Sequence, residues 1–160
     1  MAVVLRGILM AAPESALVAY WSEHRAQLRQ SESQRAVLTN YVLAIAAALS
    51  GLVVQQRFGL LTLPLSGLVM LIGLYGALAA AKYHERANYH LGQARALTNA
   101  LVQSGELPDN DALLDQARRD HYQEYPRLYR VRLHWLWTGL HLGVAAYGLV
   151  LVIVTLAVRG

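Results

Sequence analysis

Six histidines are the side chains of this sequence best suited to bind a metal ion or to exchange protons near neutral pH. His84 and His90 lie in the stretch HERANYH, which begins like the zinc-binding motif HExxH. The second histidine of that motif would fall where the sequence has Asn88, and the spacing places His84 and His90 about 240° apart around a helix. The chain also contains no cysteine. We therefore expect no metal site and no cofactor.

Arrangements for nucleophilic or acid–base catalysis are also weak. Ser50 and Ser66 lie in uncharged stretches that lack the GxSxG pattern of a nucleophile elbow. The paired carboxylates of Asp109 and Asp111 precede a helical pattern, where capping of the helix explains them. The sequence contains no phosphate-binding GxxxxGK[ST] loop. We therefore predict that the protein is not an enzyme.

His141 differs from the other histidines because a long apolar segment surrounds it. An ionisable residue inside a membrane-spanning segment often takes part in function, although His141 would lie near one end of its segment. Two interpretations stay open: a functional intramembrane polar residue, or a neutral histidine that hydrogen-bonds to a neighbouring helix.

Basic residues between the second and third apolar segments are candidates for binding an anionic ligand. With the tyrosines nearby, they offer the charges and flat rings that hold a phosphorylated ligand or a single-stranded nucleic acid. Acidic residues nearly balance them, so anchoring beside the membrane and solvated helix faces are the alternative explanation. The candidates are Lys82, Arg86, Arg95, Arg118 and Arg119.

The helices that must position these residues follow from the distribution of charge. The stretches without Asp, Glu, Lys or Arg are residues 36–56, 58–81 and 133–158. Residues 63–81 alone would form a helix about 28 Å long, close to the roughly 30 Å hydrocarbon core of a bilayer. We predict an all-α membrane protein with transmembrane helices at residues 36–56, 60–81 and 133–158. The second of these helices should continue into water as far as Gln103, because no helix breaker interrupts it.

Two further regions complete the predicted organisation. Residues 1–35 are expected to form an N-terminal arm, rather than a secretion signal, and an amphipathic helix that begins at Pro13. Residues 82–132 are expected to form a cytoplasmic helical hairpin that extends from the second span, because Gly105 and Pro108 separate two helical patterns.

Small residues recur at helical spacing in all three apolar segments. One stripe is either a helix-packing face or a pore lining, and it consists of Asn40, Ala44, Ala47 and Gly51. Close helix packing is also predicted in the other two segments, at Gly73, Ala77, Gly139 and Gly143. These stripes favour a homo-oligomer embedded in membrane lipid.

Lysines and arginines are concentrated on one side of the predicted spans. They precede the first span, follow the second and precede the third, whereas only Arg57 and Arg159 lie on the opposite side. Because positively charged flanks stay in the cytoplasm, we expect a multi-pass protein of the bacterial inner membrane. Its N-terminus would be cytoplasmic and its C-terminus outside.

The order of a charged helix, two spans and a soluble helical extension over residues 15–105 resembles SLATT-type bacterial membrane proteins. The stretches that carry this resemblance are QLRQSESQRAVLTNYVLAIAAALSGLV and KYHERANYHLGQARALTNAL. The resemblance implies an oligomeric effector of anti-phage defence that forms a pore or ion channel. A nucleotide or nucleic-acid signal, or a sensor partner, would release it. The third span departs from that pattern, and a non-conducting membrane anchor or assembly subunit for a soluble partner is the alternative.

Overall fold

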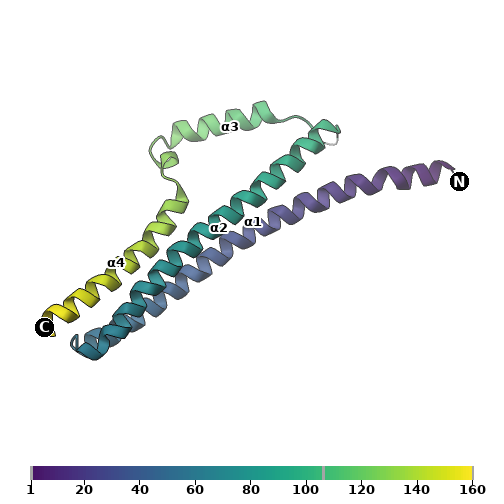
Figure 1. Ribbon diagram of the computed structural model, residues 1–160. Coiled ribbons are helices and arrows are strands. Elements are labelled where there is room, and N and C mark those ends of the chain that lie inside the picture. The colour runs from purple at the N-terminus through teal and green to yellow at the C-terminus, as the bar shows by residue number, and fades with distance from the viewer. Residues whose placement is uncertain (1, 106, 160) are drawn as a thin grey trace. The chain divides into compact units, whose positions relative to one another are not determined.

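The computed structural model describes residues 2–105 and 107–159, and every regular element in them is helical (Figure 1). In chain order the elements are α1 (Ala2–Gln55), the 3-10 helix η1 (Leu60–Thr62), α2 (Leu63–Gln103), α3 (Asp111–Glu124), the 3-10 helix η2 (Leu128–Arg130) and α4 (Leu133–Arg159). The predicted all-α fold class is confirmed for the described residues.

Three helical stretches are long and apolar enough to cross a membrane, as predicted. They are Ala16–Gln55, Leu60–Gln103 and Leu133–Val158. The first of them has 40 residues, which correspond to about 60 Å of helix. Because a bilayer core is about 30 Å thick, roughly half of that helix suffices for one crossing.

α1 is one uninterrupted helix from Ala2 to Gln55. The predicted arm, amphipathic helix and first span are therefore not separate elements, and the helix begins before Pro13. Between residues 16 and 50 the sequence has neither glycine nor proline, so the backbone has no local reason to break. α2 ends at Gln103, which is the end predicted for the continuous second helix.

Contacts within the chain divide it into two compact units. The apolar unit comprises Glu32–His84 and Arg132–Gly160, and the polar unit comprises Met1–Ser31 and Glu85–Val131. α1 and α2 each contribute residues to both units, whereas α3 belongs to the polar unit and all of α4 to the apolar unit.

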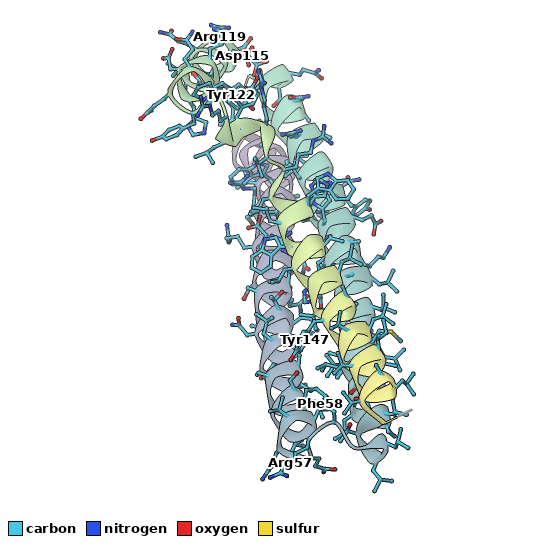
Figure 2. All side chains as sticks on the ribbon, turned by 90° about the vertical axis from the view of Figure 1, so that its left-hand side faces the viewer. Arg57, Phe58, Asp115, Arg119, Tyr122 and Tyr147 are labelled. Carbon is cyan, nitrogen blue, oxygen red and sulfur yellow. The ribbon has the colours of Figure 1, made fainter. Side chains whose placement is uncertain are left out.

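In the apolar unit, α1, α2 and α4 run side by side with small and polar side chains between them and large apolar side chains outside (Figure 2). Ala46, Ala77 and Ala145 are buried, whereas Leu71 and Leu78 are 58% and 73% exposed. A water-soluble domain rarely exposes so much apolar surface. In lipid, by contrast, helices gain nothing from hiding leucine and associate through small residues. The distribution of side chains thus fits a membrane environment.

α2 and α4 approach each other so closely that glycine is required at three positions. A Cβ atom added at any of them would lie within 3.0 Å of the neighbouring helix. The pairs in contact are Gly73 with Ala145, Gly76 with His141, and Gly148 with Met70.

In the polar unit, the partner of α2 is α1. Ala94 and Leu101 of α2 are each only 3% exposed. The indole Nε1 of Trp21 donates a hydrogen bond of 3.0 Å to Oγ1 of Thr98. These contacts fix the register of the two helices.

α3 follows a turn in which Gly105 has a φ of 79°, the left-handed conformation common just after a helix. No residue of α3 is buried, and its ion pair of 3.1 Å between Arg118 and Asp115 is exposed to solvent. Packing of α3 against α2, which the predicted hairpin implies, therefore stays a prediction.

Candidate functional site

Polar side chains are buried inside the apolar unit, although the helices around them are mostly apolar. They include Arg35, Thr39, Thr62, Ser66, His141 and Thr155. Burial of such groups is costly unless partners compensate for lost water. Arg35 and Thr39 lie one helical turn apart on α1, and both contact α4. These contacts form the candidate site.

Thr39 of α1 and His141 of α4 meet inside the apolar unit, where both side chains are at most 2% exposed. The Thr39 hydroxyl donates its proton to the carbonyl oxygen of Arg35 at 2.9 Å. Its oxygen lies 3.1 Å from Nε2 of His141. Because the hydroxyl has a single proton, Nε2 of His141 is the donor to Thr39 and carries a hydrogen atom.

The other ring nitrogen of His141 lies against Gly76 of α2. Within the described residues this Nδ1 atom has no hydrogen-bond partner. α1, α2 and α4 therefore meet at one imidazole, and glycine at position 76 provides the space for its ring.

One turn closer to the start of the apolar segment, the guanidinium of Arg35 stacks on the ring of Trp137, 5.1 Å from its centroid. The spacing of four residues from Arg35 to Thr39 and from Trp137 to His141 places the two contacts in successive layers. Arg35 is only 7% exposed. Its Nε and the indole Nε1 of Trp137 have no hydrogen-bond partner among the described residues.

His84 of α2 and His134 of α4 stack face to face, with ring centroids 4.1 Å apart and planes inclined by 8°. Burial, the neighbouring His134 and the positive charge of Arg35 all lower the pKa of His84. His134 precedes Trp137 by three residues on α4, which places this histidine pair one helical turn from the layer formed by Arg35 and Trp137. One end of the apolar unit thus collects a permanent cation and two imidazoles.

The apolar unit itself has few acidic side chains, and Glu85 follows directly after its last α2 residue, His84. The sequence of the apolar unit contains one acidic residue, Glu32, and its side chain is exposed. A buried arginine normally has a carboxylate or another anion beside it, because an uncompensated charge is costly to bury.

The small-residue stripe predicted on the first span faces outward. Asn40, Ala44, Ala47 and Gly51 are all exposed in the chain. The inner face of α1 is formed instead by Arg35, Thr39, Val42 and Ala46 and is rotated away from this stripe.

The four predicted packing residues of the other spans have different surroundings. Gly73 and Ala77 are buried, whereas Cβ atoms added at Gly139 and Gly143 would meet no atom within 4 Å. The latter two line an open groove of about 570 Å³ between α1 and α4, together with Ala46, Ala47, Ser50 and Tyr147. Tyr147 is labelled in Figure 2.

The predicted cations belong to both units of the chain. Lys82 belongs to the apolar unit and the other four to the polar unit. Nη2 of Arg86 donates to Oε1 of Gln27 at 3.1 Å, and Arg118 pairs with Asp115. Arg95 and Arg119 are exposed.

A second pair of histidines lies in the polar unit. The Nδ1 atoms of His24 and His90 are 3.1 Å apart, so one imidazole must donate and the other accept. Burial, His24 and Arg86 lower the pKa of His90, while Glu23 opposes them. Among residues 2–105 and 107–159, no three His, Asp or Glu side chains are grouped as metal ligands.

In the sequence, Arg35 is one of the basic residues that precede the first predicted span, and His84 belongs to an incomplete metal motif. Thr39 and His134 have no sequence signal of their own that points to this site. The four-residue spacings on α1 and α4 were a usable signal, but which helix faces meet cannot be read from spacing alone.

No family model, curated protein or solved structure matches this chain. The function must therefore be argued from the geometry.

Proposed function

We propose that the protein is a homo-oligomeric membrane effector that forms a pore or ion channel. In this proposal residues 36–56, 60–81 and 133–158 cross the bacterial inner membrane. The N-terminus and residues 82–132 are cytoplasmic, and the C-terminus is outside. The observation that supports the proposal best is the open groove between α1 and α4, in which small residues such as Ala47, Gly139 and Gly143 lie among larger apolar side chains.

A second copy of the chain is the occupant that suits this groove. Gly139 and Gly143 are one helical turn apart and leave the backbone of α4 accessible. Such a GxxxG arrangement lets another helix approach closely in lipid, where helices associate by packing rather than by the hydrophobic effect.

A conducting path would have to run between copies. The interior of one apolar unit is closed by side chains such as Val42, Val53 and Val69, which are at most 3% exposed. Ala47 belongs both to the groove and to the outward stripe. Association through the groove would therefore bring Asn40, on the same stripe, near the neighbouring copy and supply a polar group there.

The polar unit would receive the signal. Its exposed arginines, together with Lys82, are suited to a nucleotide, an oligonucleotide or an acidic surface of a sensor protein. The role in anti-phage defence rests on the resemblance to SLATT-type proteins. Rearrangement of packed helices is an established way to open such an assembly.

The test combines oligomeric size with ion flux. The protein is purified in detergent, its mass is measured by light scattering, and it is reconstituted into liposomes loaded with a potassium-sensitive dye. We expect a discrete oligomer that releases potassium when a cyclic oligonucleotide or its sensor partner is supplied. A monomer, or an oligomer that stays silent in every liganded state and in planar bilayers, would contradict the pore.

One observation favours the alternative of a non-conducting anchor. α3 buries none of its residues and exposes Leu113 and Leu114, which are 65% and 58% accessible. A helix of this kind is suited to bind a soluble partner. The anchor predicts that Leu113→Ser together with Leu114→Ser abolishes copurification of that partner while the membrane potential never changes.

A further inference from the structure

We propose that Arg35, His84 and Trp137 form a binding site for a phosphate group at one end of the apolar unit. The phosphate would belong to a phospholipid headgroup or to a free phosphorylated ligand. This inference stands apart from the pore, because it uses other residues and makes no demand on the oligomeric state.

The first argument is charge. Arg35 is 93% buried, since only 7% of it is exposed, and it stacks on the uncharged ring of Trp137. The positive charge of Arg35 is one of the causes that lower the pKa of His84, and His134 stacks on His84. Stacking on indole offsets part of the cost of burying a cation, but it supplies no negative charge. A bound anion would supply it.

The second argument is the set of unused donors. Nε of Arg35 and Nε1 of Trp137 are both buried without a partner in the part of the chain that the structure describes. Buried N–H groups are nearly always hydrogen-bonded in proteins. A phosphate has several strong acceptor oxygens, and arginine binds it through charge-assisted hydrogen bonds. One phosphate beside the stacked Arg35 and Trp137 side chains could accept from both.

The third argument is the histidine pair. The parallel stack of His84 and His134 is unfavourable when both rings are protonated, because two positive charges would lie 4.1 Å apart. An anion beside His84 would favour its protonated form. Phosphate binding should therefore raise the pKa of His84 and take up a proton near neutral pH.

The position along the helices fits a membrane surface. Arg35 directly precedes the uncharged residues 36–56, His84 follows residues 60–81, and His134 lies at the start of α4. If these segments span the bilayer, the three side chains lie near the level of the lipid phosphates. A lipid headgroup is one source of the phosphate, and a ligand from the cytoplasm is the other.

The experiment uses the full-length protein, stripped of phospholipid in dodecyl maltoside, and isothermal titration calorimetry. Three ligands are compared: dihexanoylphosphatidic acid, dihexanoylglycerol, which lacks only the phosphate, and inorganic phosphate. We expect phosphatidic acid to bind and dihexanoylglycerol not to bind. Binding of inorganic phosphate as well would assign the site to free ligands, whereas binding of phosphatidic acid alone would assign it to lipid.

The variants decide which residues carry the binding. Arg35→Gln should weaken binding about tenfold or more, the usual effect of losing a charge-assisted hydrogen bond. Trp137→Phe keeps the ring under Arg35 but removes the N–H, and it should weaken binding several-fold even if Arg35→Gln fails to fold. Arg57→Gln, at the turn between α1 and η1 (Figure 2), is the matched control and should bind as the parent does.

Two outcomes would overturn the site. One is equal binding of phosphatidic acid and dihexanoylglycerol. The other is a well-folded Trp137→Phe or Arg35→Gln protein that binds phosphatidic acid as tightly as the Arg57→Gln control.

Discussion

The Oγ1 atom of Thr39 lies 3.1 Å from Nε2 of His141 and joins α1 to α4 inside the apolar unit. The same hydroxyl also bonds to the carbonyl oxygen of Arg35, so Thr39 can only accept from the imidazole. This polar contact therefore fixes the rotation of the two apolar helices about their axes. Packing of leucines alone would tolerate several such rotations.

We expect Thr39→Val to destabilise the protein by about 1 to 3 kcal/mol, because it leaves the Nε2–H of His141 buried without an acceptor. Thr39→Ser keeps the hydroxyl and should lose much less stability. The measurement is unfolding of the detergent-solubilised protein by a denaturing detergent, followed by circular dichroism. Equal stability of the valine and serine variants would show that this hydrogen bond is unimportant.

Gly73→Ala should disrupt the crossing of α2 and α4. Its Cβ would lie 2.7 Å from Cα of Ala145, so the helix backbones would have to move apart. Overpacking of this kind costs about 1 to 3 kcal/mol. Gly67→Ala is the control on the same helix, because a Cβ there meets no atom within 4 Å. A cysteine cross-link between α2 and α4 should form more slowly in Gly73→Ala, and an unchanged rate would contradict the close crossing.

The polar unit should lose stability as the pH falls. The pKa of His90 is lowered in the folded protein by burial, by His24 and by Arg86, against the opposing charge of Glu23. Below the ordinary histidine pKa of about 6.5, the unfolded chain takes up a proton that the folded chain resists. The contribution of His90 to the free energy of unfolding is thus complete above that pH and decreases below it. Protonation of both the His24 and the His90 ring would also break the contact between their Nδ1 atoms, because neither could then accept.

This dependence can be isolated with His90→Gln. The difference in melting temperature between pH 7.5 and pH 5.5 should be smaller in His90→Gln than in the parent protein. His121→Gln, on the exposed surface of α3, is the control and should keep the parent's dependence. If both variants respond to pH alike, the His24–His90 pair is not the group responsible.

Association of copies should depend on the groove between α1 and α4. Gly143→Leu fills the space that we assign to a second copy and should lower the oligomeric mass, whereas Gly92→Leu, on the exposed surface of α2, should not. Asn40→Leu should leave the mass unchanged and alter the ion conductance. An unchanged mass for Gly143→Leu would exclude this groove as the interface.

The helical nature of the chain could be predicted well, because it depends on local sequence. Long runs without charge, glycine at position 105 and the lack of a breaker across Lys82 are enough to predict α2 and its end at Gln103. The start of α1 was predicted less well. Pro13 is favourable at the first turn of a helix, but the helix begins before it, and only contacts beyond the first turn can decide between these starts.

The pairing of helix faces could not be predicted in the same way. The glycines at 73, 76, 139 and 143 have similar sequence surroundings, yet the first two lie at the crossing of α2 and α4 and the last two line an open groove. A stripe of small residues indicates that close approach is possible. It does not identify which helix approaches.

The sequence by itself determined that the chain is helical and that three of its stretches are apolar enough to cross a membrane, since hydropathy and helix breakers act over neighbouring residues. The tertiary structure alone decided that Arg35 stacks on Trp137, that Thr39 binds His141 and that His84 stacks on His134. Each of these contacts joins residues about 50 to 100 positions apart, and they form only when helix rotation and depth are fixed together. That rotation depends on glycine contacts and buried hydrogen bonds between helices, which no single helix specifies.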